Sequence, residues 1–260
     1  YLVEQLPSIA HCIKSLSDRF INYPILPHLI YKEGMNYLSL LGYKGIGLYA
    51  LAAIDIAIWD AASKALNMPL ANYLGGKIKP IKTYNSRGLW LIKIQNIAQE
   101  AELLRKEGDF LALKLRIGRE TTKQDEQALE EVRRGAGEDV VVLSDYNTCF
   151  STKDAMRRCK ELDQSGFFWF EEPIKYNDYD NLAKICKKTE TPIIIGENFH
   201  GISDLMTAID KHSCDMVMPD LMRIGGVSNW LKLAAISEAS NIEVSTHLFP
   251  EVSAHLMMVT

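Results

Sequence analysis

The sequence has 260 residues, of which 47% are hydrophobic and 24% are charged, the balance of an ordinary globular protein. This length corresponds to one or two domains, and a single barrel of alternating strands and helices would use nearly all of it. The formal net charge of −4, without a basic run, gives no reason to expect nucleic acid or a membrane surface as a partner.

Five cysteines are scattered along the chain without a paired spacing, which indicates reduced thiols and argues against a disulfide frame or a zinc site. We find no apolar run of transmembrane length and no signal peptide. We therefore expect a cytoplasmic protein. The cysteines are Cys12, Cys149, Cys159, Cys186 and Cys214.

Residues 1–78 have the pattern of helices. Apolar positions recur at helical spacing in residues 7–21, and residues 47–66 predict a long, mostly buried helix. Asp55 and Asp60 lie on this second helix, where local pairing or capping explains a carboxylate better than a catalytic role does.

Seven short apolar runs follow, and they predict β-strands separated by segments of helical periodicity. Continuous runs such as VVVL and PIII are typical of strands that are buried on both faces, as in a parallel sheet covered by helices. The expected strands span residues 81–86, 110–116, 139–145, 167–171, 192–197, 214–219 and 242–247. We predict an α/β fold of the TIM type, a (β/α)7β barrel with seven strands visible and its closing strand missing from this sequence.

Charged or polar residues stand at the ends of six of these strands, 23 to 31 residues apart from one strand to the next. Parallel barrels carry their catalytic groups at the carboxyl ends of the strands. The pattern therefore predicts a catalytic ring. Its members are Lys114 with Arg116, Asp145 with Asn147, Glu171, Glu197, Asp220 and His247.

Asp145, Glu171 and Glu197 end three successive strands, so their carboxylates are expected to converge. Three hard oxygen ligands without a nearby His or Cys set suit Mg²⁺, and Mn²⁺ would also fit. The alternative is that each carboxylate separately caps a helix or forms a salt bridge.

Asp220 and His247 end the next two strands and are expected to be neighbours. A carboxylate beside an imidazole fixes its tautomer and raises its basicity, which gives an acid or base usable near neutral pH. The alternative is a structural histidine.

Lys114 and Arg116 are two residues apart on one strand and therefore face the same side. A cation there could neutralise the carboxylate of a substrate, although Arg116 could instead pair with a carboxylate of the metal site. Together with a metal ion and a His–Asp base, this site would stabilise an enediolate formed by removing the proton α to a carboxylate.

Several stretches resemble the enolase superfamily and, within it, the mandelate racemase subgroup. They are GLYALAAIDIAIWDAASKALNMPL, ALKLRIG, SDYN, FEEP, GEN, MPDLMRIGGVSNW and STHLFPEVSAHLM, of which the last two are the most specific. Residues 1–78 resemble the helical part of the family's N-terminal capping domain, and residues 79–260 resemble its barrel domain. The family commonly forms homo-oligomers.

The resemblance implies a role for each member of the ring. It implies Mg²⁺ ligands at Asp145, Glu171 and Glu197, a general base at His247 oriented by Asp220, a substrate-carboxylate site at Lys114, and pocket residues at Asn147 and Ser86.

The sequence departs from the subgroup pattern in three places. Arg116 stands where mandelate racemase has a second lysine that acts as a base, and arginine, with a pKa above about 12, accepts protons poorly. Residues 1–78 resemble only the helical part of the capping domain. The glutamate of the eighth strand would lie beyond Thr260.

One working base favours elimination, so we predict a lyase that dehydrates an acid sugar to a 2-keto-3-deoxy acid. Racemisation or epimerisation of a 2-hydroxy acid is the alternative. A glycoside hydrolase is disfavoured because the adjacent Glu171 and Glu172 point to opposite sides of one strand. A catalytically silent barrel is the remaining alternative.

Overall fold

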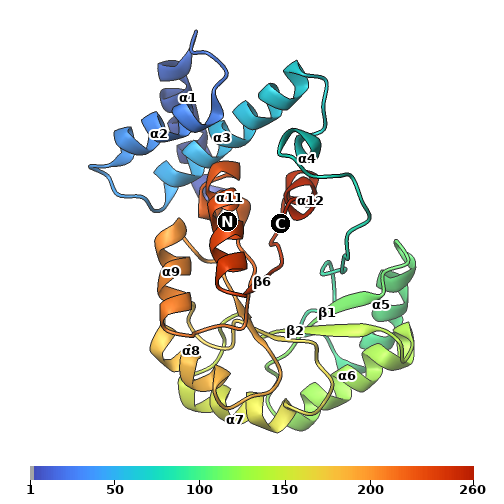
Figure 1. Cartoon of the computed structure of the whole chain (residues 1–260). Coiled ribbons are helices and arrows are strands. Elements are labelled where there is room, and N and C mark those ends of the chain that lie inside the picture. Colours follow the sequence, from blue (N-terminus) through green and yellow to red (C-terminus); the bar gives the residue numbers. More distant parts are fainter. Residues whose placement is uncertain (1–2) are drawn as a thin grey trace. The chain divides into compact units, whose positions relative to one another are not determined.

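The structure is a computed structural model that describes residues 3–260 (Figure 1). The chain divides into two compact units, one containing residues up to 81 with 196–207 and 217–260, the other containing residues 82–195 and 208–216. The first unit therefore contains the N-terminal helices together with two later segments that the sequence analysis assigned to the barrel. The domain boundary between residues 78 and 79 stays a prediction.

Helices make up most of the regular structure. In chain order they are η1 (Val3–Gln5), α1 (Leu6–Ser17), η2 (Asp18–Phe20), α2 (Pro27–Leu38), α3 (Ile46–Ala65), α4 (Leu70–Tyr73), α5 (Ile94–Lys106), α6 (Thr122–Ala136), α7 (Thr152–Leu162), α8 (Tyr179–Cys186), α9 (Ile202–Asp210), α10 (Leu221–Ile224), α11 (Val227–Ala239) and α12 (Pro250–Met257), where η marks a 3₁₀-helix.

The strands form one parallel sheet in chain order, which confirms the predicted α/β fold. They are β1 (Ala112–Arg116), β2 (Val141–Asp145), β3 (Phe170–Glu171), β4 (Ile193–Ile195), β5 (Met216–Val217) and β6 (Glu243–Val244). Strand order equal to chain order, with helices between strands, is the pattern of a (β/α) barrel.

The prediction of seven strands was wrong by one within the described residues. The segment expected at 81–86 makes only an isolated parallel bridge, between Asn85 and Leu113. The chain turns away soon after this bridge, since Leu89 has φ +54° and its carbonyl accepts a hydrogen bond from the Arg116 N–H. A non-glycine residue at positive φ does not continue a strand.

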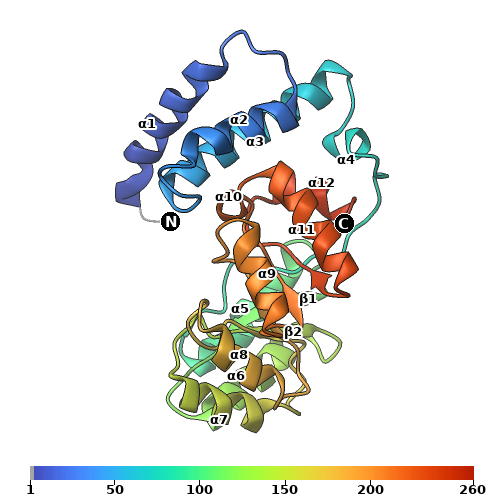
Figure 2. The same ribbon diagram turned by 60° about the vertical axis from the view of Figure 1, so that its left-hand side comes forward.

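Helix α3 is the centre of the first unit. Helices α1 and α2 lie beside it (Figure 2), and Leu16, Ile30, Ala50 and Ile54 are buried in their shared apolar core. A second core of the same unit joins α3 to α4, α10, α11 and α12. Its buried members are Trp59, Leu70, Leu221, Val227, Trp230 and Leu256.

The two acidic residues of α3 have structural partners, which are local for Asp60, as expected, but distant in sequence for Asp55. Asp55 is buried and accepts hydrogen bonds from the backbone N–H and the hydroxyl of Ser228, over 2.8 and 2.6 Å, at the start of α11. Asp60 pairs with Lys64 one turn later, at 2.7 Å. The contacts of both carboxylates are those of structural residues.

By length and composition α3 is the one helix among residues 3–260 that could cross a membrane, with a mean hydropathy of 1.4. Half of that window is buried inside the structure, and core helices of soluble proteins meet the same criterion. The prediction that the sequence has no apolar run of transmembrane length was therefore wrong. The apolar side chains of α3 nevertheless pack into the core of the first unit.

In the second unit, helices α5 to α8 line the outer side of the strands (Figure 1). Leu115 on β1, Phe170 on β3 and Ile193 on β4 are buried apolar residues at equal register, so they share the face of the sheet opposite to Asp145 and Glu171. Helix α6 begins with a capping box, in which the Thr121 side chain accepts from the Gln124 N–H and the Gln124 side chain accepts from the Thr121 N–H. Such a cap satisfies backbone donors that would otherwise have no partner.

Candidate active site

Three of the candidate residues of the second unit stand in one row across the sheet. Arg116 on β1 is the register partner of Asp145 on β2, which in turn is the partner of Glu171 on β3. Side chains at equal register on parallel strands face the same side of a sheet. The strand ends therefore direct these three side chains to a common face.

Lys114 lies between the two carboxylates of this row. Its Nζ is 2.7 Å from Glu171 Oε1 and 3.1 Å from Asp145 Oδ2, and all three side chains are almost fully buried. Burial by itself lowers the pKa of Lys114, but the charges of Glu171 and Asp145 outweigh it, so the pKa lies above its usual value. Lys114 therefore stays charged at neutral pH.

Arg116 is committed to the loop before β1. Its Nη1 donates to the carbonyl oxygens of Ser86 and Gly88, over 2.7 and 2.9 Å, and its guanidinium lies 4.1 Å from the centre of the Trp90 ring. Its Nε is 3.8 Å from Asp145 Oδ2, a longer contact than the hydrogen bonds to the loop. The ion pair between Arg116 and a metal-site carboxylate, which was the alternative from the sequence, is thus present, but at a longer distance than the hydrogen bonds of Arg116 to the loop.

Asn147 and Ser86 have roles in positioning the charged residues. The backbone N–H and the Nδ2 of Asn147 donate to the two oxygens of Asp145, over 2.8 and 3.1 Å. Asn147 has φ +46°, a conformation that asparagine tolerates better than most residues. Ser86 contributes its carbonyl to Arg116 and is half-buried.

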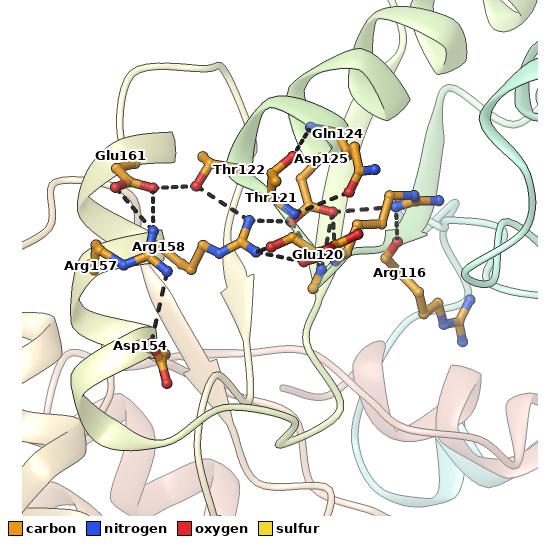
Figure 3. Close-up of polar contacts among 12 residues, drawn as sticks. Arg116, Glu120, Thr121, Thr122, Gln124, Asp125, Asp154, Arg157, Arg158 and Glu161 are labelled. Atoms are coloured by element: carbon orange, nitrogen blue, oxygen red, sulfur yellow. Dashed lines mark hydrogen bonds and ion pairs between the residues drawn. The ribbon is translucent and has the colours of Figure 1, made fainter.

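The loop that follows β1 is fixed by a buried ion pair. Asp125 on α6 accepts from the backbone N–H groups of Gly118 and Arg119, each over 3.1 Å. Figure 3 shows Arg158 reaching from α7 to this carboxylate and to the loop, where it donates to the carbonyls of Arg119 and Glu120 over 2.5 and 2.7 Å. The strand that carries Lys114 therefore ends in a rigid loop.

In the first unit, Asp220 and His247 form a close pair. The two residues are joined by an isolated parallel bridge, and Asp220 Oδ2 is 2.8 Å from His247 Nδ1. Asp220 is fully buried, and its other oxygen caps α10 by accepting from the N–H groups of Met222 and Arg223. The carboxylate therefore directs the second ring nitrogen of His247, Nε2, away from itself.

Glu197 lies on the other side of the same imidazole. Its Oε2 is 3.4 Å from His247 Nε2, and its Oε1 accepts a hydrogen bond from Asn198 over 3.2 Å. Gly196, directly before it, has φ +128° and lies so close to Met218 and Phe199 that a Cβ would be crowded there. A glycine is therefore required at the turn that presents Glu197.

Among the described residues, no three His, Cys, Asp or Glu side chains are grouped closely enough to hold a metal ion. The second unit nevertheless offers a fit for a cation, because a single charged atom, Lys114 Nζ, lies within 3.1 Å of both Asp145 and Glu171. Two carboxylates that converge on one point are the donor type that Mg²⁺ prefers. The full ligand set of Asp145, Glu171 and Glu197 stays a prediction.

Two family models match the chain. Residues 96–260 match the model described as "Enolase C-terminal domain-like", and residues 26–75 match the N-terminal domain of the mandelate racemase / muconate lactonizing enzyme family. The chain belongs to the enolase superfamily, in its mandelate racemase subgroup. The resemblance predicted from the sequence is confirmed.

Solved structures of this superfamily share the fold over the whole chain. An enolase from alpha proteobacterium bal199 with bound Mg has a TM-score of 0.97 at 39% identity, and the match covers 100% of this chain and 72% of that one. An enolase from Bradyrhizobium in complex with magnesium and mandelic acid has a TM-score of 0.94 at 28% identity, with the same coverage.

The curated relatives of this chain are enzymes of several kinds. L-talarate/galactarate dehydratase from Salmonella typhimurium is 28% identical over 216 residues, which are 83% of this chain and 54% of that protein. Racemases and epimerases match at similar identity. The chain spans about half the length of the first curated relatives it matches.

Sequence reasoning missed two polar residues near the candidate site. Tyr84 lies close enough to Lys114 to raise its pKa, and Arg223 contacts both Asp220 and Glu197. The signal available for Arg223 was its place three residues after Asp220, in the motif MPDLMR.

Proposed function

We propose that the protein removes the proton α to the carboxylate of a small acid and stabilises the resulting enediolate, and that the reaction is the dehydration of an acid sugar to a 2-keto-3-deoxy acid. The observation that carries the choice of elimination is the environment of Arg116. Its guanidinium donates to two backbone carbonyls and lies over the Trp90 ring, so it is an anchor for the loop and a poor acceptor of protons.

His247 is the proposed base. Its Nδ1 is held by the buried carboxylate of Asp220, which leaves Nε2 to accept the α-proton. The same nitrogen, once protonated, would deliver the proton to the departing β-hydroxyl. A dehydration balances in this way, since the C–H and C–O bonds break, a C=C bond forms, and water leaves before the enol becomes the keto acid.

Asp145, Glu171 and Glu197 are the proposed ligands of one Mg²⁺ ion, for which Mn²⁺ could substitute. The support is the order of the strands that the residues follow, β2, β3 and β4, together with the convergence of Asp145 and Glu171 on one cation. When bound, the ion would supply positive charge to the substrate carboxylate and so make the α-proton more acidic.

Lys114 is the proposed second cation for the substrate carboxylate. Its raised pKa keeps the ammonium charged, and its burial keeps water from screening that charge. Asn147 would hold Asp145 in its orientation, and Ser86 would line the same pocket.

Racemisation or epimerisation of a hydroxy or amino acid is the second candidate. The Bradyrhizobium structure contains mandelic acid, and curated relatives include N-succinyl-L-Arg/Lys racemase and L-Ala-D/L-Glu epimerase. We also propose a cytoplasmic location and a homo-oligomeric state, both by analogy with the family.

The test is a screen of mono- and di-acid sugars for keto-acid formation with Mg²⁺, run in deuterium oxide beside a His247→Asn variant. We expect keto acid from at least one sugar acid, lost with the variant and with a chelator. Inversion of mandelate-like acids as fast as any dehydration would favour the racemase. Activity that survives chelation would favour a glycoside hydrolase, and metal binding without α-proton exchange would indicate a silent barrel.

A further inference from the structure

Arg223 contacts two of the proposed catalytic elements of the first unit. It is the third residue of α10, which starts directly after Asp220, and its backbone N–H donates to Asp220 Oδ1 over 3.0 Å. Its Nη1 donates to the carbonyl oxygen of Glu197 over 3.0 Å and also to Oδ1 of Asn198. One residue therefore joins the partner of His247 to the loop that carries Glu197.

These contacts close a ring of four residues. Glu197 Oε2 is 3.4 Å from His247 Nε2, and His247 Nδ1 is 2.8 Å from Asp220 Oδ2. Asp220 Oδ1 accepts from the Arg223 N–H, and the Arg223 side chain returns to Glu197. A movement of Glu197 away from the imidazole would thus stretch a hydrogen bond to α10.

The loop from Gly196 to Gly201 needs such an anchor. Both glycines have positive φ, +128° and +73°, and glycine restricts the backbone less than any other residue. Arg223 binds this loop at three positions, since its own carbonyl also accepts from the Gly201 N–H over 3.3 Å. It therefore adds three hydrogen bonds to those that already hold the loop, such as the bond from the Phe199 N–H to the Gly196 carbonyl.

We propose that Arg223 is a positioning residue that holds Glu197 where it can bind the divalent cation, at a fixed separation from the Asp220–His247 pair. The inference rests on the proposed function, because only there is Glu197 a metal ligand. Arg223 acts through the backbone of Glu197 and itself touches neither metal nor substrate. Outer hydrogen-bonding partners of metal ligands typically change metal affinity about 10- to 100-fold.

The test is titration of the metal-free protein with MgCl₂ in a calorimeter, which needs no substrate. Arg223→Met keeps an unbranched, flexible side chain, shorter than that of arginine, but cannot donate, and we expect its dissociation constant for Mg²⁺ to rise about tenfold or more. Arg223→Lys keeps one donor and should lie between this variant and the wild type. Arg134→Met is the matched control, since Arg134 is exposed and pairs only with Glu131 on α6 among the described contacts.

A merely structural role would lower the unfolding temperature of Arg223→Met and leave its Mg²⁺ affinity unchanged, and that result overturns the proposal. If Arg223→Met does not fold, wild-type affinity in folded Arg223→Lys overturns it equally. If the wild type itself binds no Mg²⁺ at millimolar concentration, the proposed metal site fails and the inference fails with it. Wild-type binding with no difference in the variants refutes the inference alone.

Discussion

Asp220 uses its two oxygens for two separate tasks, and one substitution can separate them. Oδ2 contacts His247 Nδ1 at 2.8 Å, whereas Oδ1 caps α10 through the N–H groups of Met222 and Arg223, at 2.9 and 3.0 Å. Asparagine caps helices about as well as aspartate but has no charge. Asp220→Asn should therefore keep the start of α10 and lose the negative charge behind the imidazole.

The size of the effect follows from the burial of Asp220, whose exposed fraction is 0%. A hydrogen bond to a charged group contributes about 1.5–3 kcal/mol, and water does not screen it at a buried site. That stabilisation would apply to the imidazolium that forms if His247 is the base, as we propose. Since about 1.4 kcal/mol corresponds to a tenfold change in rate, we expect proton abstraction to slow roughly 10- to 150-fold.

The assay is exchange of the α-proton in deuterium oxide, followed by NMR with the acid that the substrate screen identifies and saturating Mg²⁺. Unfolding in urea is the control, and Asp220→Asn should change the free energy of unfolding by less than about 1 kcal/mol. Asp220→Ala, which removes the cap as well, should lose a further ~0.5–2 kcal/mol. Exchange at the wild-type rate in folded Asp220→Asn would refute the role given to this pair.

Three further predictions concern stability and binding. Burial raises the pKa of Asp55 to about 7, although its hydrogen bonds to Ser228 lower it, so near pH 5–6 the folded state binds a proton that the unfolded state has lost. The free energy of unfolding should therefore fall by on the order of 2–4 kcal/mol between about pH 4 and pH 7. Urea unfolding of Asp55→Asn, measured over the same pH range, should not show this fall. Arg116→Met removes two hydrogen bonds to the 86–90 loop and should speed tryptic cleavage after the exposed Arg87 in this loop. An unchanged cleavage rate would contradict the anchoring role. Mg²⁺ at a hundred times its dissociation constant should stabilise the protein by about 2.7 kcal/mol, and equal stabilisation of Glu171→Gln would argue against Glu171 as a ligand.

The regular elements could be predicted from the sequence where one pattern dominated. Helical periodicity located α3 to within one residue at each end, and apolar runs located β1 and β2 to within two residues. The strand expected at residues 81–86 failed because its end depends on a tertiary contact. The chain turns after Asn85, whose Oδ1 accepts from the Arg87 N–H, and the turn-forming residues Asn85, Ser86 and Gly88 indicate this turn. Leu89 then bonds through its carbonyl to the Arg116 N–H, and this contact with β1 depends on the tertiary fold.

At the candidate site, the position of each polar residue at the carboxyl end of a strand predicted a common face for these residues. It could not predict which side chains form hydrogen bonds or ion pairs with one another. The register of Arg116, Asp145 and Glu171 follows from chain spacing and a parallel sheet. That Lys114 would lie between two carboxylates, while Arg116 would turn to backbone carbonyls, depends on side-chain reach and on where the preceding loop passes. Arg223 was missed for the same reason, since its main partner is a backbone carbonyl.

The choice between elimination and racemisation depends on which groups can accept a proton. Racemisation by two bases needs an acceptor on each side of the substrate carbon, and β1 offers only Lys114 and Arg116 for the second one. Lys114 Nζ lies 2.7 and 3.1 Å from Glu171 and Asp145, and we propose that it binds the substrate carboxylate, so it already has a role other than that of a base. Arginine accepts protons poorly near neutral pH. An imidazole that serves twice, first as base and then as acid toward a β-hydroxyl, needs no second acceptor, and the commitment of Arg116 to the loop therefore supports the dehydration that we propose.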